Sequence, residues 1–552
     1  MIDQPQRRDP PDHESSAQEL SARILRRVEA FAVFACCAEA SLAAVTWSWR
    51  AGAMLNYGDA IAHLHIARRV FDCRFVTLSQ LGSVWLPLSH ILMLPFVQFY
   101  TLWATGIAGT IPSVLAYLLA CVGLYRLARR WLRPAEAGLA LAFFALNPNI
   151  LYLQTTAMTE PLFVCEMIWI ALAMVEWKAR LETDPERASH LHGWIALLLI
   201  AAIFTRYDGW IIALLVWTDM GTSLLKHGQL RSRSFWLASV AVVAAPIAWF
   251  IYNAVAFGDW LYFVRGPYSA MAIEARTAAH GAGPLHPGWH DPWVALVFYL
   301  KTAEMDATAA WGNIVLALSV LGTLGAWIGA RRRGFSWSLL LWMPLPFYAY
   351  SIAYASVPIF LPVWWPYSWY NTRYGVELLP ALALGIGFAA RFAFVAVWAV
   401  KPRWERYAIA ALFALVVLNT AGMVREGPLV YIESTKNLDA RMPFDQNIPS
   451  QLRSLLAQRP GGQVLMNTSV YPELVSMTGI PLRQTINETD RQIYQDALAA
   501  PASHAAIVLA FDGDEEDRAV KEHPQGLIAV ARFIAPGEPS GTLYVSGAPS
   551  HP

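Results

Sequence analysis

The sequence has 552 residues, of which 56% are hydrophobic and 15% are charged, whereas soluble globular domains carry about 25% charged residues. This composition excludes an ordinary soluble domain and predicts a polytopic α-helical membrane protein. The formal net charge of +1 says nothing by itself about nucleic acid. The positive charges are spread along the chain rather than gathered into a patch, so we expect no nucleic-acid partner.

The first 27 residues are predicted to form a cytoplasmic tail. Residues 1–19 are polar, contain three prolines and show no apolar periodicity, which is typical of disorder. The apolar run 28–49 follows a cluster of arginines and is longer than the roughly 7 to 15 residues of a signal-peptide core. We therefore expect it to stay in the protein as a membrane anchor.

The segment 50–111 gathers ionisable residues directly after this first run. Its apolar parts are interrupted by prolines and are too irregular for a simple spanning helix, so we predict a large loop that lies on the membrane. Asp59 falls at the predicted membrane edge. The polar and ionisable residues of the loop include Tyr57, Asp59, His63, His65, Arg68, Arg69 and His90.

Further apolar runs of roughly spanning length follow along the chain. With the first run they predict about eleven transmembrane helices in a membrane domain that covers residues 28–425. The approximate limits are 28–49, 112–127, 135–151, 161–177, 194–204, 210–225, 235–257, 314–330, 337–353, 376–400 and 407–423.

The loops between these runs alternate in their content of lysine and arginine, as the positive-inside rule requires. The basic loops share the side of the N-terminus, which we assign to the cytoplasm, so the segment 50–111 and everything after residue 425 fall on the opposite face. The basic residues are Arg126, Arg129, Arg130, Arg133, Lys178, Arg180, Lys226, Arg231, Arg233, Arg331, Arg332, Arg333, Lys401, Arg403 and Arg406.

Residues 426–552 differ in composition from the membrane domain. Short apolar runs at 464–466, 505–510, 527–531 and 542–545 alternate with mixed-charge segments, which predicts a small extramembrane α/β domain. No internal repeat of the kind found in transporters built from two halves is visible in the sequence.

Four separated segments place ionisable residues on the face opposite to the basic loops. Such residues at the ends of spanning helices are costly unless they are paired or hydrated, so their convergence predicts an aqueous cavity. A second interpretation is that each side chain extends to water or forms a salt bridge, and that Asp59 only begins a helix. The residues are Asp59, Glu160, Arg206, Asp208, Arg373 and the adjacent Tyr374.

The order and shared sidedness of these motifs resemble the GT-C glycosyltransferases, most of all the branch of protein O-mannosyltransferases and lipid A aminoarabinose transferases. The resemblance covers residues 28–423. Members of the family often carry paired acidic residues in the first loop, whereas Ala60 follows Asp59 here. The motifs are Gly58-Asp59-Ala60, Trp85-Leu86-Pro87-Leu88, Thr159-Glu160-Pro161 and the hexapeptide from Thr205 to Trp210.

The resemblance implies a sugar donor on a polyprenyl phosphate, with Asp59 as the general base of a single inverting displacement. It also implies an inner-membrane protein that reacts on the periplasmic face with a glycan, lipid or protein acceptor. Arg206 and Arg373 are the candidates for binding the donor phosphate, because guanidinium groups offer fixed and permanently charged donors. The alternative function is a non-enzymatic transporter or flippase of lipid-linked sugars.

The remaining polar residues are candidates for supporting roles. For Glu160 and Asp208 there are three alternatives: they orient the acceptor, pair with the arginines, or hold a divalent metal ion together with Asp59. We favour pairing, because carboxylates from three loops do not by themselves specify a metal. His63, His65 and His90 support the reaction, bind a metal ion or have a polar structural role, and we favour the structural role. Tyr374 is included because it follows Arg373. No cofactor is required by these patterns, and a divalent metal stays an open alternative.

Overall fold

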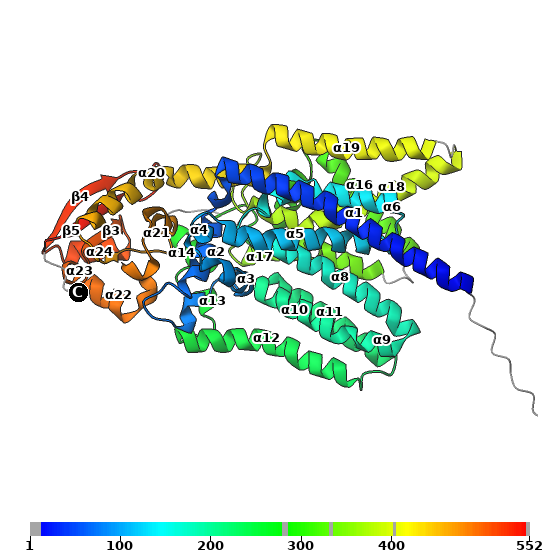
Figure 1. The fold of residues 1–552 in the computed structure, drawn as a ribbon, viewed down its shortest axis with the longest axis horizontal. Coiled ribbons are helices and arrows are strands. Elements are labelled where there is room, and N and C mark those ends of the chain that lie inside the picture. The colour runs from blue at the N-terminus through cyan, green and yellow to red at the C-terminus, as the bar shows by residue number, and fades with distance from the viewer. Residues whose placement is uncertain (1–12, 279–284, 331–334, 401–403, 548–552) are drawn as a thin grey trace, which may run out of the picture.

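The computed structural model is a helical bundle with a small mixed α/β domain at one end (Figure 1). It describes residues 13–278, 285–330, 335–400 and 404–547. Within these ranges, seven helical segments are long and apolar enough to cross a membrane, which supports the predicted integral membrane protein but does not confirm the predicted count of about eleven. The segments are Phe31–Ala51, Ile107–Ala128, Pro185–Thr205, Arg233–Phe257, Gly312–Gly329, Thr372–Val395 and Glu405–Ala457.

Every predicted apolar run lies in a helix or in two successive helices, because a buried or lipid-facing backbone must satisfy its own hydrogen bonds. Run 135–151 is divided at Asn147, whose side chain accepts from the amide of Asn149 while Pro148 begins the next helix. The helices are α1 (His13–Ala51), α5 (Ile107–Ala128), α6 (Pro134–Ala145), α7 (Pro148–Leu153), α8 (Glu160–Thr183), α9 (Pro185–Ser189), α10 (Leu191–Thr205), α11 (Asp208–Lys226), α12 (Arg233–Phe257), α16 (Gly312–Ala330), η3 (Phe335–Trp342), α17 (Pro344–Tyr354), η4 (Thr372–Leu378), α18 (Leu379–Val400) and α19 (Glu405–Glu426).

Two segments are more ordered than the sequence indicated. Helix α1 begins at His13, so residues 13–19 are helical rather than a disordered tail. The predicted loop after residue 258 contains α13 (Tyr262–Arg265), α14 (Ala270–Ala278) and α15 (Pro292–Ala307). Asp291 caps α15 by accepting from the amides of Trp293 and Val294. Residues 1–12 and the basic residues Arg331, Arg332, Arg333, Lys401 and Arg403 lie outside the described residues.

The segment after α1 was predicted to be a large loop, and it contains several short helices. Gly52 and Gly106 bracket it with positive φ angles of 68° and 86°, which are left-handed conformations that glycine adopts without strain. The elements are η1 (Ala53–Leu55), α2 (Gly58–Arg69), η2 (Leu78–Leu81), α3 (Leu88–Val97) and α4 (Tyr100–Ala104).

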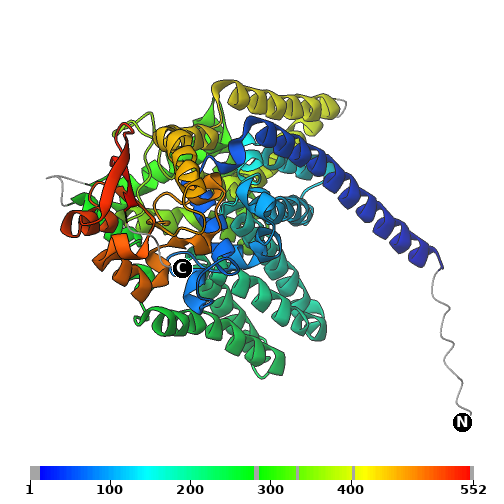
Figure 2. The ribbon, with the colours of Figure 1, turned by 60° about the vertical axis from the view of Figure 1, so that its left-hand side comes forward.

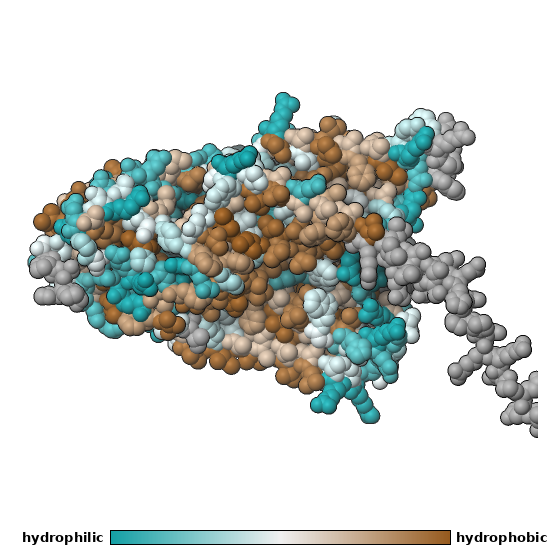
Figure 3. Space-filling model, in the orientation of Figure 1, coloured by the Kyte–Doolittle hydropathy of each residue, from teal (hydrophilic) through white to brown (hydrophobic). Residues whose placement is uncertain are grey.

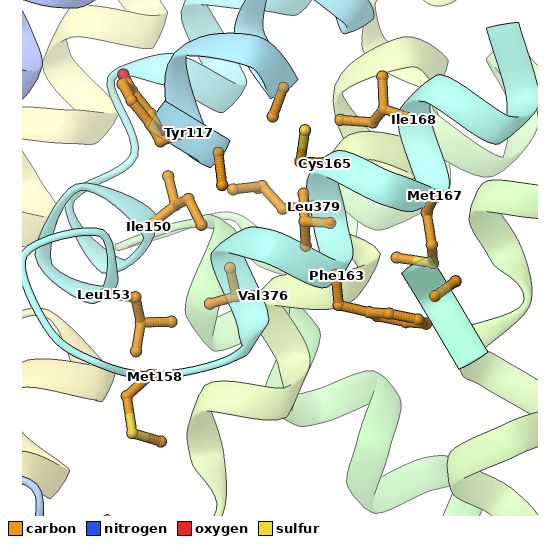
Figure 4. Close-up of a cluster of buried hydrophobic side chains, with 14 of the residues drawn as sticks. Tyr117, Ile150, Leu153, Met158, Phe163, Cys165, Met167, Ile168, Val376 and Leu379 are labelled. Carbon is orange, nitrogen blue, oxygen red and sulfur yellow. The ribbon is translucent and has the colours of Figure 1, made fainter. Parts of the chain in front are cut away.

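A buried apolar cluster joins the helices that carry the ionisable residues. Figure 4 shows side chains from α5, α7, α8, η4 and α18 meeting, among them Tyr117, Ile150, Phe163, Val376 and Leu379, all of which are at most 1% exposed. Interiors of this kind are closely packed and resist displacement. The cluster therefore holds the first turn of α8 and the adjoining η4 in a fixed relative position.

The C-terminal domain is built around a five-stranded sheet of order β2-β1-β3-β5-β4, in which β1 pairs parallel to β2 and β3, and β5 pairs antiparallel to β3 and β4. The four apolar runs correspond to β1, β3, β4 and β5, and the two-residue β2 was not foreseen. The elements are α20 (Leu429–Ala457), β1 (Val464–Leu465), α21 (Glu473–Thr478), η6 (Leu482–Gln484), β2 (Thr485–Ile486), η7 (Glu488–Asp490), α22 (Gln492–Ala499), α23 (Pro501–His504), β3 (Ile507–Phe511), α24 (Glu515–Glu522), β4 (Leu527–Phe533) and β5 (Gly541–Ser546).

The surface of the molecule also differs between the helical bundle and the C-terminal domain. Hydrophobic residues dominate the side of the helical bundle in Figure 3, whereas hydrophilic residues gather over the C-terminal domain and at the opposite end of the bundle. Helix α1 begins at that opposite end, and α20 leads from the bundle to the sheet in both ribbon views (Figures 1 and 2). An apolar middle between two polar ends is the pattern expected of a membrane-spanning bundle.

Candidate functional site

Arg373 is the centre of one cluster of charged side chains. Its Nη2 lies 2.6 Å from Oδ2 of Asp59, its Nε 3.2 Å from Oε1 of Glu160, and its Nη1 3.1 Å from Oε1 of Glu433. The arginine side chain is 7% exposed and that of Asp59 is 43% exposed. The guanidinium therefore uses all three of its nitrogen atoms on carboxylates, and one of these carboxylates is open to solvent.

Arg206 is the centre of a second cluster, in which every carboxylate is buried. It lies 3.5 Å from Oε1 of Glu160, 3.4 Å from Oδ1 of Asp208 and 3.1 Å from Oε1 of Glu377. Its Nη2 also donates to the hydroxyl of Tyr348 at 2.6 Å, and that hydroxyl donates to Glu377 at 2.8 Å. Glu160 belongs to both clusters and links them.

One aromatic ring lies between the two arginines. The ring centre of Tyr374 is 5.0 Å from Cζ of Arg373 and 5.1 Å from Cζ of Arg206. Tyr374 also stacks on Tyr348, with ring centres 5.1 Å apart. Such contacts attract a cation to the ring face. Because the two rings are buried against the core, the rings keep the two guanidinium groups apart and in place.

The backbone brings the carboxylates to this position through the starts of helices. Glu160 and Asp208 are the first residues of α8 and α11, and Asp59 lies in the first turn of α2. A helix N-terminus carries partial positive charge and stabilises a nearby carboxylate. The glycine after Asp208 is required by packing, because a Cβ atom at Gly209 would meet the carbonyl oxygen of Ala202 at 2.2 Å.

The two clusters contain more carboxylates than guanidinium groups. Two arginines face five acidic side chains, namely Asp59, Glu160, Asp208, Glu377 and Glu433. Among the described residues, Oε2 of Glu160, Oε2 of Glu377 and both carboxylate oxygens of Asp208 have no hydrogen-bond partner. Buried carboxylates without donors are costly, so the site retains a capacity to accept hydrogen bonds from a bound molecule.

The predicted histidines differ in their relation to the site. His63 lies one turn after Asp59 on α2 and its Nδ1 is 2.8 Å from Nε2 of His90. His65 lies on the other side of the helix, 6.5 Å from the ring of Trp103, and is not brought to the arginines. Burial lowers the pKa of His63 to about 4 and that of His65 to about 3, so both rings are neutral near pH 7.

The charged groups are thus arranged as arginine–carboxylate pairs. Within the residues that the structure describes, no group of three histidine, cysteine, aspartate or glutamate side chains is arranged to hold a metal ion. A carboxylate beside a guanidinium, half open to solvent, is able to take a proton from a hydroxyl group, and a guanidinium of this kind is able to bind a phosphate.

No model of a protein family matches the sequence. Over 286 residues, the chain is 22% identical to the undecaprenyl phosphate-alpha-4-amino-4-deoxy-L-arabinose arabinosyl transferase 2 of Proteus mirabilis. That match covers 50% of this chain and 46% of the relative, so the chain aligns with about half of the curated relative's length.

The structure is similar to that of ArnT from Cupriavidus metallidurans bound to undecaprenyl phosphate. The TM-score is 0.55 at 15% identity, and the match covers 93% of this chain and 98% of that protein. The apo structure of the same protein gives a TM-score of 0.52 at 16% identity, with the same coverage. The chain has the ArnT fold. This likeness agrees, in the fold, with the resemblance that the order of the motifs indicated.

Three residues of the two clusters were not predicted from the sequence. Glu377 and Tyr348 lie in apolar segments, where an isolated ionisable residue is a signal in itself, and Glu377 follows Arg373 by four positions. Glu433 lies beyond residue 425, in the part of the chain assigned to a separate domain. Nothing in the composition around Glu433 distinguishes it from other polar residues of α20.

Proposed function

We propose that this protein is a membrane glycosyltransferase that transfers a sugar from a polyprenyl-phosphate donor to an acceptor hydroxyl. The observation that carries the proposal is the half-exposed Asp59, held 2.6 Å from a buried arginine beside a second arginine. The curated relative is named as a transferase of a sugar on undecaprenyl phosphate, and the structural neighbour binds undecaprenyl phosphate. Both support a donor of this class.

Arg373 and Arg206 bind the donor phosphate in this proposal. A phosphate offers several anionic oxygens to the fixed N–H groups of a guanidinium, and such bonds are stronger than those between neutral groups. Nη2 of Arg373 is the nitrogen that contacts the solvent-exposed carboxylate. A phosphate that reaches Arg373 from the open side therefore competes with Asp59 for this nitrogen and leaves the carboxylate free.

Asp59 then acts as the general base. Its carboxylate takes the proton of the acceptor hydroxyl while the oxygen forms a bond to the anomeric carbon. The bond from that carbon to the phosphate oxygen breaks on the opposite side, and the polyprenyl phosphate leaves with the electron pair. A single displacement of this kind inverts the configuration at the anomeric carbon and needs no general acid, since phosphate is a stable anion.

We place the reaction on the periplasmic face of the inner membrane. Basic residues lie in the last turns of α5, α8 and α11, and in α8 and α11 this is the end opposite to Glu160 and Asp208; such residues remain on the cytoplasmic side. The proposed division is a cytoplasmic tail of residues 1–27, a membrane domain of residues 28–425 with its catalytic loop at 50–111, and a periplasmic domain of residues 426–552. The acceptor is a glycan, a lipid or a protein.

The test is sugar transfer by the purified protein in lipid nanodiscs, with a panel of polyprenyl-phosphate sugars and with Asp59→Asn as the variant. Transfer by the parent that is lost in Asp59→Asn, while undecaprenyl phosphate still binds, is the expected result. Asp439→Asn is the matched control, because Asp439 is 58% exposed on α20. Movement of sugar lipids across vesicles without any transfer would instead identify the protein as a transporter.

A further inference from the structure

Helix α20 connects the membrane bundle to the C-terminal sheet and touches both segments that carry the central ion pair (Figure 1). We propose that α20 is a positioning element of the transferase site: Glu433 fixes Arg373, and Arg441 fixes the chain that leads into Asp59. The C-terminal domain is then a part of the catalytic site rather than a separate module. This inference rests on the proposed transferase function.

Glu433 holds the turn that precedes Arg373 as well as the arginine itself. One carboxylate oxygen accepts from the backbone amide of Asn371 at 2.9 Å, and the other accepts from the amide of Thr372 at 2.8 Å and from its hydroxyl at 2.5 Å. The first oxygen also contacts Nη1 of Arg373 at 3.1 Å. Because Glu433 is 1% exposed, these bonds are not weakened by water, and the side chain sets where the guanidinium lies.

Arg441 holds the chain on the other side of the ion pair. Its Nη1 donates to the carbonyl oxygen of Asn56 at 3.2 Å and its Nη2 to that of Leu55 at 2.5 Å. Its Nε lies 3.1 Å from Oδ2 of Asp445, which orients the guanidinium. Asp59 follows Asn56 by three residues and lies in the first turn of α2, so Arg441 determines where this turn begins.

The segment that leads into Asp59 is also held to α20 by neutral groups. The hydroxyl of Tyr57 donates to the carbonyl oxygen of Val430 at 2.8 Å, and the side-chain amide of Asn56 contacts the hydroxyl of Ser434 at 3.4 Å. The ring of Tyr57 also faces Arg373, with Cζ 5.3 Å from the ring centre. Contacts from one helix therefore reach both partners of the ion pair.

The rest of the C-terminal domain is attached to the same loop. Asp72 accepts from the amide of Leu482 at 3.2 Å, and Arg74 donates to the side chain of Gln463 at 2.5 Å. Tyr100 donates to the carbonyl oxygen of Ser476 at 2.7 Å. A domain anchored at several points on the loop 50–111 cannot shift without moving that loop, so removal of residues after 423 would also remove the supports of Asp59 and Arg373.

The experiment compares Glu433→Gln and Arg441→Met with two control variants on the same helix, Asp439→Asn and Arg453→Met, whose side chains are exposed. Glutamine keeps the size of Glu433, but its NH2 group cannot accept from the amide of Thr372. We expect kcat to fall at least tenfold in both test variants and less than twofold in the controls. Arg441→Lys, which keeps the charge but not the paired geometry, should restore part of the rate.

A double-mutant cycle separates positioning from general damage to the fold. If Arg441 acts through Asp59, adding Arg441→Met to Asp59→Asn should lower the residual transfer less than twofold. The carboxylate that Arg441 positions is already absent from the Asp59→Asn protein. In the same way, Glu433→Gln should have little further effect in an Arg373→Lys protein. Full tenfold losses in both backgrounds would overturn the proposal.

Hydrogen exchange on the same proteins tests positioning without any transfer. Amides of residues 55–61 should exchange at least tenfold faster in Arg441→Met, and those of residues 371–375 in Glu433→Gln, while strand β3 keeps its protection. Unchanged exchange at these segments would overturn the inference whatever the transfer rates. A parent protein that transfers no sugar would refute the proposed function alone, since the exchange results stand independently.

Discussion

The two arginine clusters have similar composition but different access to solvent. Arg373 contacts three carboxylates, and one of them, Asp59, is 43% exposed. Arg206 also contacts three carboxylates, but all of them are buried, and the buried hydroxyl of Tyr348 joins them. The same residue types therefore build an open cluster and a closed cluster that share Glu160.

This difference in exposure indicates which carboxylate takes part in the reaction and which carboxylates support the fold. The exposed carboxylate is the one that an acceptor hydroxyl reaches, so the proton transfer belongs to Asp59 beside Arg373, whereas the carboxylates around Arg206 are buried. A closed cluster resists change, because removing one buried partner leaves the others without compensation. We therefore expect changes in the open cluster to affect transfer and changes in the closed cluster to affect stability first.

The largest expected effect is that of Asp59→Asn on the transfer rate. Loss of a general base lowers a rate by roughly 10²- to 10⁴-fold. The affinity for undecaprenyl phosphate should stay equal or rise, because Nη2 of Arg373 no longer has a carboxylate as competitor. Titration of undecaprenyl phosphate into both proteins measures this affinity. A variant that loses both transfer and phosphate binding would contradict the assignment of separate roles.

Arg206→Met should destabilise the protein more than Asp59→Asn does, because Asp59 is 43% exposed and the carboxylates around Arg206 are buried. Methionine fills a similar volume but leaves Glu377 and Asp208 buried without their cation, and breaking a buried ion pair costs about 3–5 kcal/mol. Thermal unfolding followed by tryptophan fluorescence measures the loss of stability. Arg265→Met is the control, because Arg265 is 62% exposed. Donor binding should weaken as well, because Arg206 also binds the donor phosphate in the proposed mechanism, and wild-type stability would contradict its role in the fold.

In the C-terminal domain, Glu516 is a buried carboxylate that contacts a tyrosine hydroxyl instead of an arginine. Oε1 of Glu516 accepts from the hydroxyl of Tyr494 at 2.7 Å, and Glu516 is buried. Burial and the nearby Asp514 raise its pKa from 4.5 to about 8. The folded state thus binds a proton more tightly than the unfolded state between these two values, and the free energy of unfolding falls as the pH rises through that window.

Glu516→Gln should remove the contribution of Glu516 to this pH dependence, which amounts to about 3.5 kcal/mol between pH 5 and pH 8. Hydrogen exchange in strand β3, corrected for the intrinsic exchange rate, measures the free energy of unfolding at both values. The control is Glu522→Gln at the exposed end of α24. If the parent and Glu516→Gln showed the same pH dependence, Glu516 would not be its source.

The sequence was sufficient to locate most of the helices and the open cluster. Apolar runs predict helices well, since lipid-facing backbone has few alternatives, and Asp59, Glu160 and Arg373 were recognisable as ionisable residues beside such runs. Strand β2 was too short for any pattern to indicate. Glu433 could not be found, because its role depends on a contact with Arg373 across 60 positions of the chain.

The histidines show a different limit. His63 and His65 are two positions apart, and residues with this spacing on a helix do not share a face. Once 58–69 is known to be the helix α2, this spacing separates His63, which lies one turn from Asp59, from His65, which packs near Trp103. The segment was predicted to be a loop, and a loop has no helical periodicity that would place His63 and His65 on different faces.

The smallest expected effect is that of Tyr348→Phe in the closed cluster. The hydroxyl accepts from Arg206 and donates to Glu377, but Nη2 of Arg206 still lies 3.1 Å from Oε1 of Glu377 without it. The charge pair therefore survives, and the loss should be about 1 kcal/mol of stability, with transfer changed less than twofold. Thermal unfolding and the transfer assay measure the two effects, and Tyr350→Phe on the exposed side of α17 is the control. A loss of transfer far beyond the loss of stability would show that the hydroxyl of Tyr348 also takes part in the reaction.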